Sequence, residues 1–335
     1  MCVIASSTAL TRLSEWPRIK LANLPTPIRP LVRLTEALGR PALNLLVKLD
    51  SETGFGLGGN KVRKLEFELA PDRLEGITCL ITAGGPQSNH CRVTAAAAAR
   101  LGLRCVLIVN GPEPETPTGN ALLHRLFGAE IVTVPERKDR STQLQSTAAD
   151  IEMEGGHPLV IPIGASTGLG SLGYAAASVE LFKQLTNQKP PPERTVVFVA
   201  SSSCGTLAGL LLGISLLELN DLLLVGVSAD MSATEIEERT KQIAREGAEL
   251  LGWDGALLTD SIKAIDDQVG DGYGLSTAAS DEALRMFALH EGLVLDPTYT
   301  AKAAAGLISW VRTGMVSDLD RVVFLHTGGH PGLLT

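Results

Sequence analysis

The chain has 335 residues, of which 44% are hydrophobic and 20% are charged, enough for two domains or one large α/β unit with a sizeable core. Lys and Arg total 29 against 37 Asp and Glu, so the net charge is -8, and no Lys/Arg-rich tract stands out. This balance argues against a nucleic acid or an anionic membrane as partner. No uninterrupted apolar segment reaches the ~20 residues that a membrane span needs.

The five cysteines are scattered, odd in number and without a C-x-x-C pair. Such usage in a long chain indicates reduced thiols and predicts a cytoplasmic protein. The first residues are mildly apolar but lack the basic start and long apolar core of a signal peptide, which favours the same interpretation.

Short apolar runs alternate with helix-like segments along most of the chain. The runs are near-continuous in Val, Ile and Leu, which is typical of strands buried on both faces of a parallel sheet. We expect strands at 44–50, 79–85, 104–111, 130–135, 159–164, 195–203, 222–228 and 321–329. We expect helices at 62–70, 91–102, 119–128, 141–154, 174–185, 206–219 and 233–251. This alternation predicts βαβ crossovers, open doubly wound sheets and two α/β lobes with a cleft between them. The proline-rich stretch 185–195 is the best linker candidate.

The stretch GFGLGGNKVRKLE (54–66) carries several glycine-loop patterns. Its glycines satisfy G-x-G-x-x-G, but three residues separate them from the preceding apolar run, and the next strand ends without an acidic residue to hold a ribose. The phosphate-loop pattern also fails, because Asn60 displaces Lys61 and Val62 stands where Ser or Thr would bind magnesium. Glycines before a helix are also ordinary punctuation, so the loop alone assigns no cofactor.

Further turns have the composition of a binding site. AGGPQSNH (83–90) leaves an expected strand and enters an alanine-rich helix that Ser88 and Asn89 could cap. ASSSCGTLAG (200–209) does the same with small residues, which let backbone N–H groups close on an anion at a helix N-terminus. Capping or surface cover would explain these residues equally well. Aromatic and hydroxyl side chains lie in three later segments, DGYG (271–274), LDPTYTAK (295–302) and HTGGHPG (326–332).

Two other classes of site are disfavoured. His326 and His330 lie four residues apart, but the glycines and proline around them oppose a helix and no carboxylate completes a set, so we expect no metal. Neither G-x-S-x-G nor H-E-x-x-H occurs to support a hydrolase.

Taken together and in this order, GGNKVRKLE, QSNH, SSSCGT, GDGYG, LDPTYT and HTGG resemble the D-cysteine desulfhydrase/1-aminocyclopropane-1-carboxylate (ACC) deaminase family. The resemblance runs from about residue 21 almost to the C-terminus. It implies an enzyme dependent on pyridoxal 5'-phosphate, with two open, mostly parallel twisted sheets and flanking helices (fold type II, tryptophan synthase β-like). It also implies a large domain of residues 1–52 and 166–335, a small domain of residues 53–165, a site in the cleft, and a homodimer.

The resemblance assigns the cofactor-binding residues. Lys61 resembles the Schiff-base lysine, which later acts as the base at the substrate Cα. A lysine beside the positive end of a helix dipole is disfavoured in its charged form and stays nucleophilic. Lys64, on the same helix face at i+3, resembles the phosphate-side lysine. The expected phosphate loop consists of Ser201, Ser202, Ser203, Cys204, Gly205 and Thr206.

The resemblance also assigns a substrate side and a residue for the pyridine nitrogen. Tyr273 and Tyr299 resemble the two tyrosines that flank the substrate and move protons. Either Thr327 or Thr300 would face the pyridine nitrogen, and a neutral hydroxyl there suits β-elimination better than a long-lived carbanion. The loop expected to bind the substrate carboxylate and the cofactor O3′ consists of Gln87, Ser88, Asn89 and His90, with Ser88 a candidate proton relay.

Departures from the family pattern bear on the substrate. ACC deaminases usually carry QSNQ and a glutamate after the late tyrosine, where this chain has His90 and Thr300. Both features favour a desulfhydrase-like lyase that releases pyruvate and ammonia. Ser202, Cys204 and Pro86 also differ from the usual residues and leave the exact substrate open. D-cysteine is the first expectation, L-cysteate the second and ACC the third.

Two rival interpretations remain. A nicotinamide-dependent oxidoreductase would use the glycines at 54–59, and a nucleotide-dependent thermal shift would reveal it. A protein of the same fold that has lost turnover would keep the site lysine and bind an amino acid without producing pyruvate.

Overall fold

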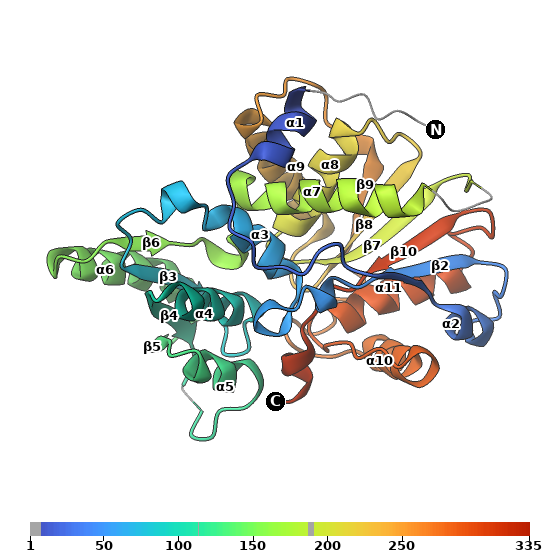
Figure 1. The fold of residues 1–335 in the computed structure, drawn as a ribbon. Coiled ribbons are helices and arrows are strands. Elements are labelled where there is room, and N and C mark those ends of the chain that lie inside the picture. Colours follow the sequence, from blue (N-terminus) through green and yellow to red (C-terminus); the bar gives the residue numbers. More distant parts are fainter. Residues whose placement is uncertain (1–7, 113, 187–190) are drawn as a thin grey trace.

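The computed structural model describes residues 8–112, 114–186 and 191–335, and in this part of the chain two sheets are flanked by helices (Figure 1). The larger sheet has the strand order β1-β2-β10-β7-β8-β9 and the smaller one β5-β4-β3-β6. The strands of the larger sheet are β1 (Ile28–Pro30), β2 (Asn44–Lys48), β7 (Thr195–Ser201), β8 (Leu222–Ser228), β9 (Ile262–Ile265) and β10 (Arg321–Leu325). Those of the smaller sheet are β3 (Cys79–Gly84), β4 (Arg104–Asn110), β5 (Glu130–Val134) and β6 (Pro158–Val160).

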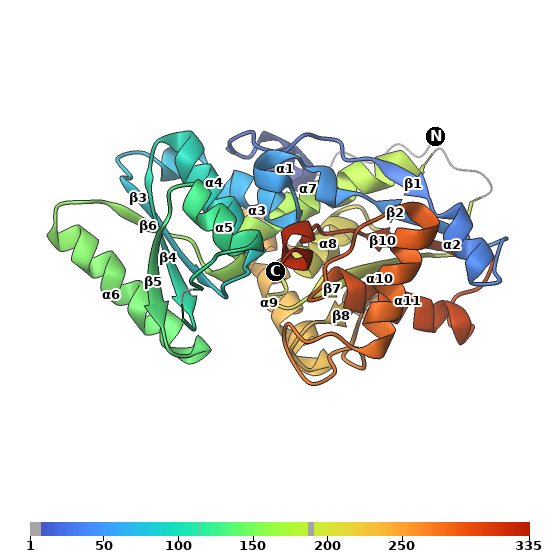
Figure 2. The same cartoon turned by 90° about the horizontal axis from the view of Figure 1, so that it is seen from below.

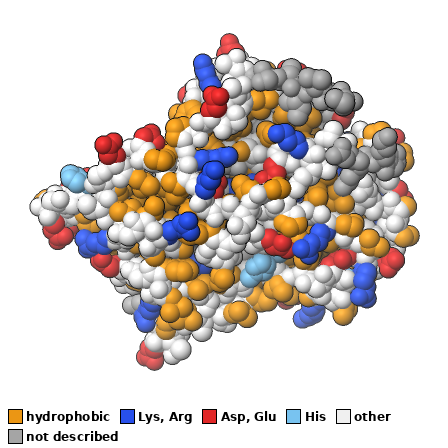
Figure 3. Space-filling model, viewed as in Figure 1, with side chains coloured by type: hydrophobic (Ala, Val, Ile, Leu, Met, Phe, Trp, Pro, Cys, Tyr) orange, Lys and Arg blue, Asp and Glu red, His pale blue; other side chains and the backbone are white. Residues whose placement is uncertain are grey.

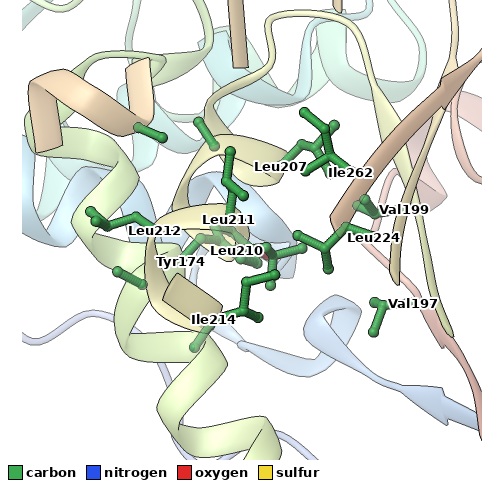
Figure 4. Close-up of a cluster of buried hydrophobic side chains, with 14 of the residues drawn as sticks. Tyr174, Val197, Val199, Leu207, Leu210, Leu211, Leu212, Ile214, Leu224 and Ile262 are labelled. Carbon is green, nitrogen blue, oxygen red and sulfur yellow. The ribbon is translucent and has the colours of Figure 1, made fainter. Parts of the chain in front are cut away.

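The larger sheet is buried on both faces. Its strands pair in parallel, except that β1 runs antiparallel to β2. Alternate residues of β7 enter opposite cores: Val197 and Val199 pack towards α7 (Gly168–Leu185), α8 (Gly205–Leu216) and α9 (Ala233–Leu250). Val196 and Phe198 pack on the other side, with α2 (Val32–Ala37), α10 (Ala278–Glu291) and α11 (Thr300–Arg312). Figure 4 shows the first of these cores, where leucines of α8 meet side chains of β7 and β8. Period-two burial on both faces explains why these strands are continuous apolar runs.

The smaller sheet is also covered on both faces (Figure 2). Its strands are all parallel. Leu80 and Leu107 pack with the alanine-rich α4 (Asn89–Leu101), whereas Ile81 and Ile108 pack with α6 (Arg140–Met153) on the opposite face. The helix α5 (Gly119–Leu126) lies beside α4, and α3 (Asn60–Glu68) packs on α7 of the larger sheet.

The prediction of mostly parallel sheets is confirmed, and each of the eight apolar runs contains a strand. Of the run at 159–164, only the first two residues belong to a strand, β6, and a 3-10 turn begins at Ile163. The expectations omitted the short strands β1 and β9 and the helices α1 (Thr8–Glu15), α2, α10 and α11. Nearly every residue of α11 is buried, so it lacks the polar face that marks a surface helix.

The strands of the two sheets lie on different sides of the expected domain limits. All strands of the smaller sheet lie within residues 53–165, and all strands of the larger one lie outside that range. The expected linker at 185–195 lies partly outside the described residues, and it connects α7 to β7 within the larger unit. The domain limits themselves remain a prediction.

Acidic and basic side chains are interspersed among neutral and hydrophobic ones on the face drawn in Figure 3. Within the described ranges, no helix is both long and apolar enough to cross a membrane.

Candidate active site

A cavity of about 240 Å³ lies between the two sheets, where the carboxyl ends of strands from both sheets point. Gly84 at the end of β3 and Asn110 at the end of β4 line it from the small sheet. The loop after β7 and Thr327, after β10, line it from the large sheet. Crevices beyond the carboxyl ends of parallel strands are the usual ligand sites of open α/β sheets.

Lys61 reaches this cavity from the first turn of α3. The turn before α3 needs glycine: Gly59 has φ 108°, and a Cβ there would lie 3.0 Å from the Thr327 carbonyl oxygen. This close approach of the two backbones lets the Asn60 N–H donate a hydrogen bond to the same oxygen at 3.0 Å. Burial lowers the pKa of Lys61 to about 8, so its amine is partly neutral near physiological pH.

Lys64 lies one turn further along α3 and is fully buried. Its Nζ donates to Ser166 Oγ at 3.1 Å, and no described carboxylate forms an ion pair with it. Burial first, and the charge of Lys61 second, hold the pKa of Lys64 well below its ordinary value. A second cation pointed at the same region is costly in a folded protein unless an anion joins it.

Small hydroxyl side chains and a helix N-terminus complete a cradle beside these lysines. The residue before α8, Cys204, has φ 66°, and a Cβ on the next residue, Gly205, would lie 2.6 Å from Ser166 Oγ. Ser166 Oγ donates to Ser203 Oγ at 2.8 Å, and Asn60 Nδ2 donates to Thr206 Oγ1 at 2.9 Å. Ser201 and Ser202 also line the cavity. First-turn N–H groups, hydroxyls and two lysines are groups that suit an anion.

Ser88 and Asn89 line the cavity at the start of α4. Ser88 Oγ caps the helix by accepting the N–H of Cys91 at 3.1 Å. Asn89 Oδ1 accepts from Asn120 Nδ2 at 2.9 Å, which fixes the amide orientation. Capping and site lining therefore coexist in these residues.

The other two residues of the expected substrate loop are engaged elsewhere. Gln87 is not among the cavity-lining residues; its Oε1 accepts the N–H of Asn120 at 2.8 Å and holds the start of α5. His90 lies at the cavity wall but is 3% exposed, and its Nε2 shares a hydrogen bond with Thr82 Oγ1 at 2.8 Å. Burial keeps the pKa of His90 well below its ordinary value. These contacts favour a positioning role for both.

Tyr273 and Tyr299 come from separate segments, yet their hydroxyls are hydrogen-bonded to each other at the cavity. Asp296 orients Tyr299 by accepting its backbone N–H at 2.9 Å. Lys302 holds the loop of Tyr273, since its Nζ donates to the Gly272 carbonyl at 3.0 Å. Burial raises the pKa of both tyrosines, so the hydroxyls keep their protons.

The two candidate threonines differ in position. Thr327 lines the cavity. Thr300 is fully buried outside the cavity lining, and its Oγ1 donates to Asp296 Oδ1 at 2.7 Å. The structure thus places Thr300 at the first position of α11, bonded to Asp296, and leaves Thr327 as the candidate for a ligand contact.

Sequence reasoning missed several residues that shape the cavity. Asn60 lies inside the glycine motif at 54–66, and only its position next to Lys61 pointed to a role in the site. Ser166 lies 102 residues from Lys64, from which its hydroxyl accepts a hydrogen bond. Arg137 and Arg140 belong to a charged segment, PERKDR, that would ordinarily be solvated, yet both line the cavity.

Comparison with known proteins agrees with this geometry. The model of the family "Pyridoxal-phosphate dependent enzyme" matches residues 19–328. D-cysteine desulfhydrases of Salmonella newport (strain SL254) and Salmonella typhi are 40% identical to this chain over 329 residues, covering 97% of each chain. A solved ACC deaminase homologue shares 32% identity with a TM-score of 0.86, covering 98% of this chain and 96% of its own. The processed form of threonine deaminase isoform 2 from Solanum lycopersicum, at 16% identity and a TM-score of 0.64, covers 96% of this chain and 88% of its own and shares the fold. The chain therefore belongs to the pyridoxal-phosphate dependent enzyme family.

Proposed function

We propose that this chain is a lyase of D-cysteine desulfhydrase type, which eliminates the β-substituent of a small amino acid and releases pyruvate and ammonia. The observation that carries the proposal is Lys61, a cavity lysine whose pKa is lowered to about 8 by burial, beside an anion cradle. The 40% identity to D-cysteine desulfhydrases along nearly the whole chain supports the same reaction.

The residues present fit pyridoxal phosphate. Its phosphate would lie at the N-terminus of α8, within reach of the Ser201–Thr206 loop, where it would balance the buried charge of Lys64. Lys61, at the cavity, would hold the aldehyde carbon. Thr327 would face the pyridine nitrogen with a neutral hydroxyl. When bound, the cofactor withdraws electrons from the Cα of the attached amino acid and so makes its Cα–H bond acidic.

Side chains of the cavity would bind the substrate carboxylate and transfer the protons. Ser88 and Asn89, at the positive end of α4, would bind the substrate carboxylate. Lys61 Nζ, in its neutral form, would accept the Cα proton. The protonated hydroxyls of Tyr273 and Tyr299 would deliver a proton to the departing group. Ser88 Oγ, within the same cavity, would serve as a relay.

D-cysteine is the proposed substrate, with L-cysteate and ACC as alternatives. The ACC deaminase homologue among the solved structures keeps ACC in consideration, but the residue after Tyr299 is a buried threonine that is engaged with Asp296. The scattered cysteines support a cytoplasmic location, and the family resemblance supports a homodimer.

Pyruvate release by the cofactor-loaded protein tests the proposal, with D-cysteine, L-cysteate and ACC supplied in parallel. We expect pyruvate and sulfide from D-cysteine, and a loss of at least about 1,000-fold in Lys61→Ala, because both the proton acceptor and the cofactor attachment are removed. A Lys61→Ala protein that still turns over substrate would sink the mechanism. A thermal shift with NADH and none with pyridoxal phosphate would favour the oxidoreductase alternative. Bound cofactor without any pyruvate would favour the binding-protein alternative.

A further inference from the structure

Arg140 brings an uncompensated positive charge to the cavity. It is the first residue of α6 and is only 6% exposed, yet it is among the residues that line the cavity. Its Nε donates to the Arg137 carbonyl at 3.1 Å, and no carboxylate in the described ranges forms an ion pair with its guanidinium. A buried arginine is ordinarily paired, so this one calls for an anionic partner.

The neighbouring Arg137 shows the contrast. Its guanidinium forms an ion pair with Asp230 at 2.8 Å and lies over the Tyr273 ring at 5.4 Å from the ring centre. Asp230 follows β8 of the large sheet, whereas Arg137 follows β5 of the small sheet, so this pair bridges the cleft. The charge of Arg137 is thus compensated within the protein, and that of Arg140 is not.

We propose that Arg140 binds an oxyanion carried on the β-carbon of the substrate, a sulfonate or a phosphate, and so extends the substrate range beyond D-cysteine to amino acids with an anionic β-substituent. The inference rests on the proposed function. The α-carboxylate is already assigned to Ser88 and Asn89 at the start of α4. Arg140 begins α6, a different element of the small sheet from α4, and it lines the same cavity as Tyr273 and Tyr299. A guanidinium fork matches the oxygens of a sulfonate or phosphate.

The chemistry balances without a further reactant. Removal of the Cα proton leaves an electron pair that forms the Cα=Cβ double bond. The bond from Cβ to sulfur or oxygen breaks, and its electrons leave with sulfite or phosphate. Water then releases ammonia and pyruvate. Because the leaving group gains a negative charge as the bond breaks, a fixed cation beside it stabilises the transition state more than the ground state.

Binding is measured first, in the Lys61→Ala protein, which cannot complete the reaction. Titration calorimetry compares L-cysteate and O-phospho-L-serine with L-alanine, which has no β-substituent to leave. We expect both anionic ligands to bind about 10- to 100-fold more tightly than L-alanine, and Arg140→Gln to remove that difference. Equal losses for L-alanine and the anionic ligands would mean that Arg140 holds the α-carboxylate, which would overturn the proposal.

Turnover is measured next. The kcat/KM for L-cysteate and the kcat/KM for O-phospho-L-serine are each divided by the kcat/KM for β-chloroalanine, which is supplied as both enantiomers. We expect Arg140→Gln to lower at least one ratio by about 10- to 100-fold and Arg140→Lys to restore part of it. The control is Arg245→Gln, an exposed arginine of α9, which should leave both ratios unchanged. The two anionic substrates distinguish a sulfonate site from a phosphate site. Unchanged kcat/KM ratios in Arg140→Gln would overturn the inference about Arg140. Absence of pyruvate from every substrate would instead contradict the proposed function, and the calorimetry alone would then test the role of Arg140.

Discussion

Helix α3 has two sides that treat positive charge in opposite ways. On one side Arg63 is 2% exposed and fully paired: its Nε donates to Asp50 Oδ2 at 2.9 Å and its terminal nitrogen Nη1 to Glu180 Oε2 at 3.0 Å. Tyr174 also donates to Asp50 Oδ2, at 2.6 Å. On the other side, among the described residues, no carboxylate forms an ion pair with Lys61 or Lys64.

The pKa values record this difference. Burial alone would lower the pKa of Arg63, but Asp50 and Glu180 raise it above its ordinary value. For Lys61 burial outweighs the contacts with Lys64 and Cys204 that raise the pKa, and the pKa falls to about 8. A buried cation with its partners is part of the framework, whereas a buried cation without them is available for a ligand or a reaction.

The largest effect is expected on the paired side. Arg63→Met should lower the free energy of unfolding by about 3–5 kcal/mol, because it leaves the buried carboxylate of Asp50 without its ion-pair partner. Glu180 would keep only its ion pair with Lys48. Urea unfolding followed by circular dichroism measures the change. Arg63→Lys keeps a positive charge but loses the two-pronged guanidinium, so its free energy of unfolding should lie between those of the unchanged protein and Arg63→Met. A loss below about 1 kcal/mol would show that the cluster is not held together by its charges.

Lys64→Met should act in the opposite way. The cofactor-free protein should be as stable as the unchanged one or more stable, since the substitution removes a buried amine that has no ion-pair partner and whose charged form burial disfavours. Affinity for pyridoxal phosphate should fall about 10- to 100-fold, through loss of a charged contact to the phosphate. Equilibrium dialysis gives the affinity and thermal unfolding gives the stability. Destabilisation of the cofactor-free protein with unchanged affinity would remove Lys64 from the anion cradle.

A smaller effect is expected from pH. Only neutral Lys61 can attack the cofactor aldehyde, so the rate at which the cofactor-free protein takes up pyridoxal phosphate should rise with pH and level off above about 8. At pH 7 about 10% of Lys61 would be neutral, far more than for a lysine of ordinary pKa. Stopped-flow absorbance measures the rate. A rate that keeps rising to pH 10 would show that burial does not lower this pKa.

The sequence predicted the parallel sheets well, because strands buried on both faces must be apolar at nearly every position, and β7 and β8 show this. It predicted α4 and α8 for a similar reason, since their small or apolar residues follow a strand and a turn. It did not predict α11, which is buried all round, or β9, which is a short edge strand. Periodicity carries little information in both cases.

For the site, the cofactor class came from the family resemblance, which rests on six short motifs taken together and in order. No single motif named the cofactor, because a glycine turn or a helix N-terminus also occurs as ordinary punctuation and capping. Only the tertiary structure distinguishes Thr327, which lines the cavity, from Thr300, which is bonded to Asp296, since both follow apolar runs and only their packing differs. It also decided which charges are paired. Arg63 and Arg140 look alike in the sequence, but Asp50 and Glu180 come to Arg63 from distant segments, and no carboxylate in the described ranges comes to Arg140.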